Sequence, residues 1–440
     1  MQKISWMLAL VLACLVAACS GGGGGNEATS STSTSTSSGA SSGAGSSSSS
    51  GTGSSTGSTS TSTGTGTGST TPTTPTPTPT TPTVNNTLTV TVSSGGYGAL
   101  NVLLASVTIC VPGTTTCQTI DNVLVDTGSY GLRLMASAVS LPLPQSTSSA
   151  GNKLATCSAF ASGYSWGSVR TADVKLGGET ASALPVQLIA DSSYSTVPSD
   201  CSSQGAVNLN APTLIGANGI LGVGLQAQDC PDCVANANSV YYDCPTSTTC
   251  TATTATLAQQ VANPVSYFAQ DNNGVILQLP AIPATGQAGA TGQLVFGIGT
   301  RSNNGLGSAT VFAVDATSNS ISTTYNGTDY SWSFIDSGSN GLFFEDTSIT
   351  TCSTTVFYCP PSMLALSATL LGTNGASTKV NFNVGNAPAM VLLGSWALSS
   401  LAADVSGMFD WGLPFFYGRS VYTAINGKST PGGMGPYYAF

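Results

Sequence analysis

The sequence predicts a mainly β protein that follows a low-complexity tether. Apolar and polar residues alternate with period two, or β-branched residues cluster, in short runs such as Thr87 to Val92, Val123 to Val125 and Gly292 to Phe296. Glycine, asparagine and proline interrupt these runs and mark turns. Long stretches with the 3.6-residue period of an amphipathic helix are scarce, so we expect many short strands joined by turns.

The composition restricts the chemistry. The 440 residues include 9 Lys+Arg, 18 Asp+Glu and no histidine, which gives a formal net charge of -9. Serine and cysteine hydrolases that use histidine, and metal sites that use imidazole, are therefore excluded. The scarcity of cations argues against a nucleic-acid partner, because phosphates require a face rich in lysine and arginine. Carboxylate, hydroxyl, thiol and backbone chemistry remain.

The first 18 residues have the features of a lipoprotein signal peptide. One charge at Lys3 precedes an apolar run that ends in Val16-Ala17-Ala18-Cys19. Small residues before a cysteine fit the bacterial lipobox, which predicts lipidation of Cys19 and anchoring to a bilayer of the bacterial cell envelope. The serine after Cys19 favours the outer over the inner membrane. The alternative is an ordinary signal peptide with a chance cysteine.

Residues 19–83 form the predicted tether. From Ser20 to Thr83 the chain consists almost entirely of Gly, Ser, Thr and Pro. Such a segment cannot bury enough apolar surface to offset the entropy lost on ordering, so we expect it to be disordered.

The cysteines indicate disulfide bonds. Of the 12, Cys14 lies in the signal peptide and Cys19 would carry lipid, which leaves an even number for up to five bonds in an exported protein. Two local pairs enclose short segments and are the candidates Cys110-Cys117 and Cys352-Cys359. Pairing among the other six is not deducible from the sequence: Cys157, Cys201, Cys230, Cys233, Cys244 and Cys250. Cys230 and Cys233 could instead form a redox dithiol or half of a thiolate zinc site.

Two segments of the predicted β region repeat each other. Asn122 to Leu134 reads NVLVDTGSYGLRL, and Ser331 to Phe343 reads SWSFIDSGSNGLF. Each places apolar β-formers before Asp-[Thr/Ser]-Gly-Ser and continues to Gly-Leu. A buried strand that leads into an aspartate costs desolvation unless the carboxylate has a partner or a purpose.

Asp126 and Asp336 therefore suggest a carboxylate dyad. Two carboxyl groups held close together cannot both ionise, so the pair shares one proton and offers an acid and a base at once. Such a pair can activate a water with one carboxylate and protonate a carbonyl with the other. This chemistry hydrolyses an amide without histidine, metal or cofactor.

The ordered set of motifs resembles the pepsin-type bilobal aspartic proteases. Besides the two aspartate segments, it includes a tyrosine-bearing segment, Tyr164 to Ser168, at the distance of the family's flap. Two apolar-glycine strands resemble those that pass beside each aspartate loop, one with Ile220, Leu221 and Gly222 and one with Gly412. The resemblance implies two related β-barrel-like lobes with a cleft between them, an N-terminal lobe at residues 84–300 and a C-terminal lobe at 301–440.

The resemblance also implies roles for individual residues. Asp126 and Asp336 would be catalytic, and the flap and substrate-binding region would include Tyr164, Trp166, Gly167 and Arg133. The residues expected to support the dyad are Thr127, Gly128, Ser129, Ser337, Gly338 and Ser339.

This chain departs from the family at one position, and the register of its second apolar-glycine strand is open. Arg133 stands where the family has a tryptophan that bonds the flap tyrosine. Three roles are open for this cation: lowering the pKa of the dyad, binding an acidic substrate group, or pairing with a surface carboxylate. The segment Val391 to Gly394 is a rival for the second apolar-glycine strand.

The expected function is a membrane-tethered, monomeric endopeptidase that cleaves polypeptides at acid pH without a metal or other cofactor. Two alternatives remain open. One is an inactive binding or inhibitor-like lipoprotein on the same fold. The other is a stalked β-rich adhesin in which the two aspartates are unrelated loop residues.

Overall fold

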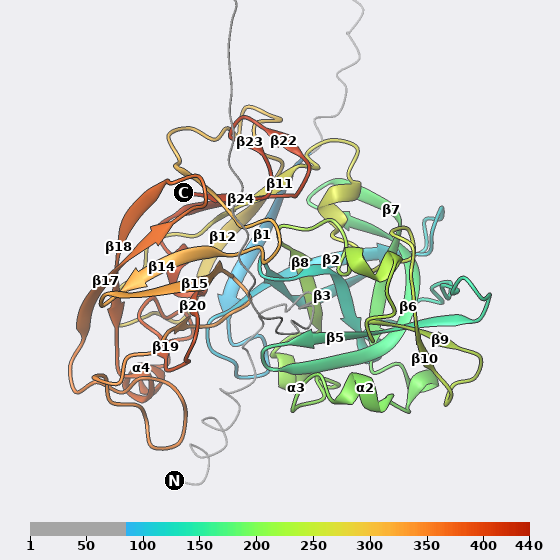
Figure 1. Cartoon of the computed structure of the whole chain (residues 1–440), viewed down its shortest axis with the longest axis horizontal. Coiled ribbons are helices and arrows are strands. Elements are labelled where there is room, and N and C mark those ends of the chain that lie inside the picture. The colour runs from blue at the N-terminus through green and yellow to red at the C-terminus, as the bar shows by residue number, and fades with distance from the viewer. Residues whose placement is uncertain (1–84) are drawn as a thin grey trace, which may run out of the picture. The chain divides into compact units, whose positions relative to one another are not determined.

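The computed structural model describes residues 85–440 (Figure 1), so the predicted signal peptide, lipidated Cys19 and tether lie outside the described residues. Strands dominate and the helices are short, which confirms the mainly β class. The runs expected at Thr87 to Val92, Val123 to Val125 and Gly292 to Phe296 lie in β1, β3 and β12. Within residues 85–440, no helix has the length and apolar character needed to cross a membrane.

The largest sheet has 15 strands, and it spans the described chain from its first strand to its last. Its strands, in spatial order, are β10 (Thr251–Thr253), β9 (Tyr241–Cys244), β5 (Lys153–Phe160), β6 (Gly163–Leu176), β7 (Glu179–Ile189), β4 (Tyr130–Met135), β8 (Gly219–Val223), β3 (Cys117–Asp126), β2 (Val102–Cys110), β1 (Thr87–Ser93), β12 (Ala290–Phe296), β11 (Gly274–Gln278), β21 (Ser420–Ala424), β24 (Tyr437–Ala439) and β13 (Val311–Ala313). Because three of these strands follow residue 301, the sheet continues past the expected lobe boundary, which stays a prediction.

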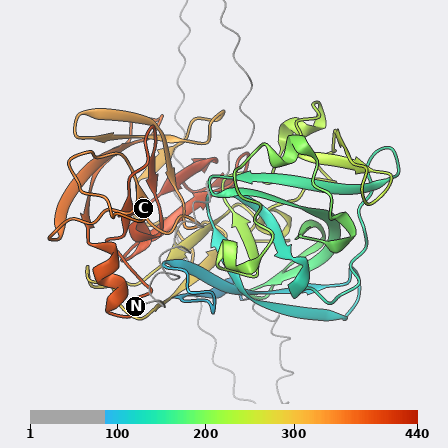
Figure 2. The same cartoon turned by 90° about the horizontal axis from the view of Figure 1, so that it is seen from below.

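A second sheet has seven strands, all from the last third of the chain. In spatial order they are β18 (Ser377–Val384), β17 (Leu364–Leu371), β14 (Ile321–Tyr325), β15 (Thr328–Ile335), β20 (Phe409–Trp411), β16 (Leu342–Phe343) and β19 (Ala402–Ala403). A short ribbon pairs β22 (Ser429–Thr430) with β23 (Gly433–Met434). Figures 1 and 2 both show the orange and red strands of the second sheet on one side and the green β5, β6 and β7 on the other.

The helices are single turns or little more, because proline and glycine interrupt the chain around them. The α-helices are α2 (Ser199–Ser202), α3 (Pro212–Ile215) and α4 (Ala387–Leu392). The 3₁₀ turns are η2 (Ala136–Ala138), η3 (Ser192–Tyr194), η4 (Pro231–Val234), η5 (Pro264–Tyr267) and η6 (Leu413–Phe416).

The same three-strand arrangement occurs twice. Strand β3 leads into the first aspartate loop (126–129), continues as β4, and pairs in parallel with β8, which also pairs antiparallel with β4. Strand β15 leads into the second aspartate loop (336–339), continues as β16, and pairs in parallel with β20, which also pairs antiparallel with β16. The sequence repeat is therefore also a structural repeat.

Five disulfide bonds brace the described chain. Cys110–Cys117 closes the β2–β3 hairpin, and Cys352–Cys359 closes a loop after β16. The three bonds that the sequence left open are Cys157–Cys201, Cys230–Cys233 and Cys244–Cys250. Cys230 and Cys233 thus form a buried disulfide rather than a free dithiol.

Candidate active site

In each three-strand unit, the aspartate stands at the end of the strand that leads into the loop. Asp126 is the last residue of β3, and Asp336 directly follows β15. Asp126 lies opposite Gly222 of β8, and the Asp336 backbone N–H donates to the Trp411 carbonyl of β20 at 3.1 Å. Each aspartate therefore stands at the end of a buried, hydrogen-bonded strand, which fixes its position.

The two loops face each other so closely that glycine is required in both. A Cβ added to Gly128 would lie 2.4 Å from Cγ of Asp336, and one added to Gly338 would lie 2.6 Å from Cγ of Asp126. Any larger residue would displace the opposite carboxyl group. The two carboxyl groups lie within hydrogen-bonding reach of each other. The loops expected from the sequence to form a dyad are therefore brought together.

Reciprocal hydrogen bonds join the two loops. The Ser337 N–H donates to Thr127 Oγ1 at 2.9 Å, and the Thr127 N–H donates to Ser337 Oγ at 3.1 Å. Each hydroxyl in turn donates to a strand carbonyl of the other unit, Thr127 to Ile335 at 3.2 Å and Ser337 to Val125 at 2.8 Å. All four polar groups are buried and satisfied, so the contact positions one aspartate relative to the other.

Each carboxyl group is also held by its own loop. The Gly128 N–H donates to Asp126 Oδ1 at 2.8 Å, and the Gly338 N–H donates to Asp336 Oδ1 at 2.7 Å. The Ser339 hydroxyl donates to Asp336 Oδ2 at 2.9 Å, and the Ser129 hydroxyl makes the corresponding bond to Asp126. The six supporting residues expected from the resemblance all contact the pair or join its loops.

The environment favours a proton on Asp336. Burial raises its pKa well above the ordinary value, and repulsion from Asp126 and from a third carboxyl group, Asp410, adds to this. Burial also raises the pKa of Asp126, but hydrogen bonds from Asp336, Ser129 and the loop amides oppose the rise. The pair therefore holds a proton on Asp336 and a negative charge on Asp126.

Thr127→Val is expected to lower the free energy of unfolding by about 1–3 kcal/mol, because valine keeps the shape but leaves the buried Ser337 N–H without an acceptor. Urea unfolding at constant pH measures this loss. Thr119→Val on the exposed part of β3 is the matched control and should change the stability by less than about 0.5 kcal/mol. Equal effects of the two substitutions would show that the contact between the loops does not stabilise the protein.

Two apolar-glycine strands pass beside the aspartate loops. Ile220, Leu221 and Gly222 belong to β8, where a Cβ on Gly222 would lie 2.6 Å from the backbone N of Tyr130. Gly412 follows β20, and a Cβ there would lie 2.0 Å from the Gly341 carbonyl oxygen. Gly412 is thus the structural counterpart of Gly222. The rival segment, Val391 to Gly394, instead ends α4 and exposes Leu392 and Leu393.

The sequence interpretation missed Asp410, which lies between Phe409 and Trp411 on β20. It is 1% exposed and interacts electrostatically with both aspartates. The signal that could have identified it is a carboxylate inside the apolar run from Met408 to Phe416, because burying such a group without a partner is costly.

The predicted flap residues lie near the turn of the β5–β6 hairpin. Tyr164 is 8% exposed and packs against the Cys157–Cys201 disulfide, and the Trp166 indole donates to the Tyr194 carbonyl at 2.8 Å. A Cβ on Gly167 would lie 1.8 Å from the carbonyl oxygen of the neighbouring Leu188. Among residues 85–440, no hydrogen bond joins the Tyr164 side chain to either aspartate loop, so its role as a flap tyrosine stays a prediction.

Arg133 pairs with a carboxylate, one of the three roles left open for it, but that carboxylate is buried rather than on the surface. Arg133 Nη2 lies 2.7 Å from Asp229 Oδ2, and the two side chains are 4% and 6% exposed. Arg133 also donates to Gln187 Oε1 at 2.8 Å, and that atom accepts a bond from Ser165 of the β5–β6 hairpin at 3.1 Å. Arg133 therefore links the strand after the first aspartate loop to the hairpin.

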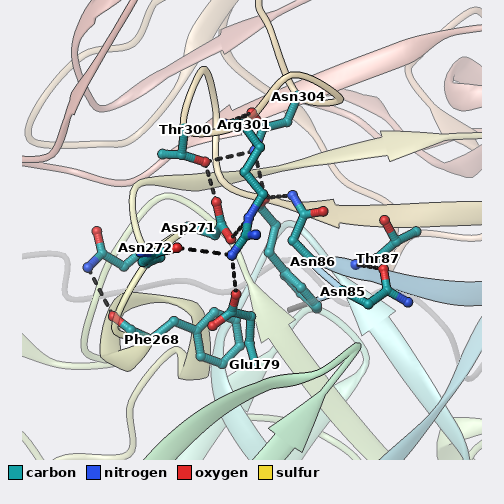
Figure 3. Close-up of polar contacts among 12 residues, drawn as sticks. Asn85, Asn86, Thr87, Glu179, Phe268, Asp271, Asn272, Thr300, Arg301 and Asn304 are labelled. Atoms are coloured by element: carbon teal, nitrogen blue, oxygen red, sulfur yellow. Dashed lines mark hydrogen bonds and ion pairs between the residues drawn. The ribbon is translucent and has the colours of Figure 1, made fainter. Parts of the chain in front are cut away.

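A second carboxyl pair has a different character (Figure 3). Arg301 Nε lies 2.5 Å from Asp271 Oδ2, and its Nη2 lies 3.2 Å from Glu179 Oε1. Burial, with the neighbouring Asp271, raises the pKa of Glu179 to about 7 despite the arginine. Because a cation accompanies these carboxylates, the cluster is a structural ion pair that joins β7 to the loop after β12.

Over residues 85–440, no group of three or more Cys, Asp or Glu side chains is arranged to hold a metal ion. A pocket of about 390 Å³ is lined in part by Leu141, Pro142 and Leu143 and by the Arg170–Asp191 ion pair, and neither aspartate of the dyad lines it.

The fold and site define a class: a mainly β protein whose two repeated units bring together a buried pair of aspartates. The chain belongs to a family described as "Protein of unknown function (DUF3443)", whose model matches residues 82–440. Among solved structures, it is similar to the aspartic proteinase from Irpex lacteus, with 17% identity, a TM-score of 0.46, and coverage of 80% of this chain and 96% of that one. A search of curated protein sequences finds no match.

Proposed function

We propose that this protein is an aspartic-type endopeptidase. The observation that carries the proposal is the contact between the loops: each glycine leaves room only for the opposite carboxyl group, so Asp126 and Asp336 form one hydrogen-bonded pair. A histidine-free chain has few other ways to activate water, and this pair supplies a base and an acid.

The charge distribution assigns the two roles. Asp126, whose carboxylate accepts bonds from Ser129 and two loop amides, takes a proton from the attacking water. Asp336, which retains its proton, donates it to the carbonyl oxygen of the substrate as the C–O bond forms. Asp126 then gives the proton it took from water to the amide nitrogen as the C–N bond breaks, and Asp336 takes a proton back from a hydroxyl of the intermediate as the carboxyl product forms.

Export and membrane anchoring are part of the proposal. Five disulfide bonds support a location outside the reducing cytosol. The lipobox at Cys19 and the segment 19–83 would tether the catalytic region to the bacterial envelope.

The pair predicts a bell-shaped dependence of kcat/KM on pH. Activity needs one proton on the pair, so it falls at low pH when Asp126 is protonated and at high pH when Asp336 loses its proton. Because burial raises the pKa of Asp126 from 3.8, we expect the acid limb above pH 4, with activity persisting towards neutral pH.

The test incubates the purified protein with a denatured protein substrate between pH 3 and 9 and identifies the products by mass spectrometry. We expect internal cleavage that a statine-type transition-state analogue inhibits. Absence of cleavage at every pH, by a protein shown to be folded and oxidised, would reject the endopeptidase and favour a binding protein on this fold.

A further inference from the structure

Asp410 breaks the symmetry between the two aspartate-loop units. In the first unit, Ile220 of β8 lies opposite Leu124 of the parallel strand β3, and Gly222, two residues later, lies opposite Asp126. In the second unit, Asp410 lies opposite Phe334 at the corresponding position. A carboxyl group thus occupies a site where the matching unit buries an aliphatic side chain.

In the described part of the chain, the surroundings of Asp410 contain no cation, and the one polar side chain beside it, Ser339, is already bonded to Asp336. Phe409 and Trp411 pack in the aromatic core, so Asp410 points to the opposite face of β20. Within residues 85–440, neither of its carboxyl oxygens has a hydrogen-bond partner, and no lysine or arginine pairs with it. The nearby Ser339 hydroxyl donates to Asp336 instead.

A carboxyl group without partners is stable in such a place only while it is protonated. Burial raises the pKa of Asp410 to about 8, repulsion from Asp126 adds to this, and the Ser339 hydroxyl opposes it. The ionisable groups that interact with it are Asp126, Asp336 and Tyr438 of β24. Asp410 is therefore the third member of a group of carboxyls that compete for protons.

We infer that Asp410 is a positioning residue that acts through Asp336, and that its charge sets the pH at which the dyad loses its shared proton. This inference rests on the proposed function, because its first test measures peptide hydrolysis. When Asp410 ionises, its negative charge lies near Asp336 and strengthens the hold of Asp336 on its proton. The catalytic proton is thereby retained to higher pH than two carboxylates alone would allow.

The first experiment compares pH profiles of kcat/KM for wild type, Asp410→Asn and Asp410→Leu, where leucine imitates Ile220. Without the charge, Asp336 loses its proton earlier, so the alkaline limb of both variants should move by about one pH unit towards acid. Each profile is scaled to its own maximum, so a general loss of activity does not move the limb. Asp121→Asn removes the same charge from an exposed position in the middle of β3 and should leave the limb in place.

The outcomes separate the two proposals. Hydrolysis with a shifted limb in both Asp410 variants supports the inference. Hydrolysis with an unshifted limb overturns it and leaves the endopeptidase standing. Absence of hydrolysis by the wild type rejects the endopeptidase, and the coupling is then decided without activity.

The experiment that needs no activity measures the pH dependence of urea unfolding for wild type, Asp410→Asn, Asp336→Asn and the double variant. If the two carboxyls compete for protons, removing one lowers the pKa of the other, so their effects on the pH dependence of stability are not additive. Additive effects between pH 4 and 9 overturn the inference whether or not the protein hydrolyses peptides.

Discussion

Asp336→Asn is expected to lower kcat/KM for peptide hydrolysis by at least about 10³-fold, because the amide cannot donate the proton that the carbonyl oxygen of the substrate requires. The substitution keeps the size of the side chain: the Gly338 N–H still has an oxygen to bond, and the Ser339 hydroxyl can accept from the new amide NH2 instead of donating. The measurement is kcat/KM on one peptide substrate from pH 4 to pH 8.

The stability of Asp336→Asn is the control that distinguishes a loss of the catalytic acid from misfolding, and the direction of its change can be predicted. The folded pKa of Asp336 is raised above its unfolded value, so the wild-type protein loses stability as pH rises above about 4. Asp336→Asn does not ionise, so it does not lose stability in this way as pH rises. At pH 7 the variant should therefore unfold at a higher urea concentration than wild type, whereas at pH 3 this gain should vanish. A variant that is both inactive and less stable at pH 7 would indicate misfolding rather than removal of the acid.

The matched substitution Asp126→Asn should reduce activity to a similar extent, because it removes the base. The double variant should be little worse than either single variant, since the two groups act as one unit. Asp121→Asn changes an exposed residue in the middle of β3 and should retain wild-type activity. Independent, multiplying losses from Asp126 and Asp336 would contradict a shared mechanism.

Arg133→Met should cost about 3–5 kcal/mol of unfolding free energy, because it leaves the Asp229 carboxylate buried without its cation. Burial already raises the pKa of Asp229, and Arg133 and the Tyr241 hydroxyl oppose the rise. Without the arginine the folded pKa rises further, so the loss should grow as pH rises above about 4. Urea unfolding at pH 4 and pH 8 measures both effects.

Adding Asp229→Asn to Arg133→Met removes the carboxylate that the first substitution leaves unpaired. Arg133→Met combined with Asp229→Asn should recover part of the lost stability at pH 8, because no unpaired charge is then buried. Arg170→Met is the comparison, since the Arg170–Asp191 pair is 21% and 9% exposed and should contribute less. A double variant as unstable as Arg133→Met alone would show that Arg133 stabilises the protein through packing and the Gln187 bond rather than through its charge.

The strands and aspartate loops were predictable because their signals are local. A strand needs only its alternating or β-branched residues and its flanking turns, so the runs in β1, β3 and β12 were identified from short windows. The repeat of Asp-[Thr/Ser]-Gly-Ser after two apolar strands likewise identified the two loops that the structure brings together. The short cysteine pairs at Cys110 and Cys352 follow from the same proximity along the chain.

Pairing between distant segments was not predictable. Arg133 and Asp229 are 96 positions apart, and nothing near either residue identifies the other. The partner of Cys157 was equally open, because any of the other central cysteines could have paired with it, and only folding selects Cys201. Asp410 was overlooked because its significance depends on the parallel pairing of β20 with β15.

The sequence by itself determined the fold class, the absence of imidazole chemistry and the presence of two equivalent aspartate loops. Only the tertiary structure decided that the cation Arg133 is paired away from solvent and that a third carboxyl group, Asp410, accompanies the dyad. The reason is physical: backbone periodicity and turns are set by neighbours in the chain, whereas the charge state of a buried group depends on desolvation and on groups that folding brings near it.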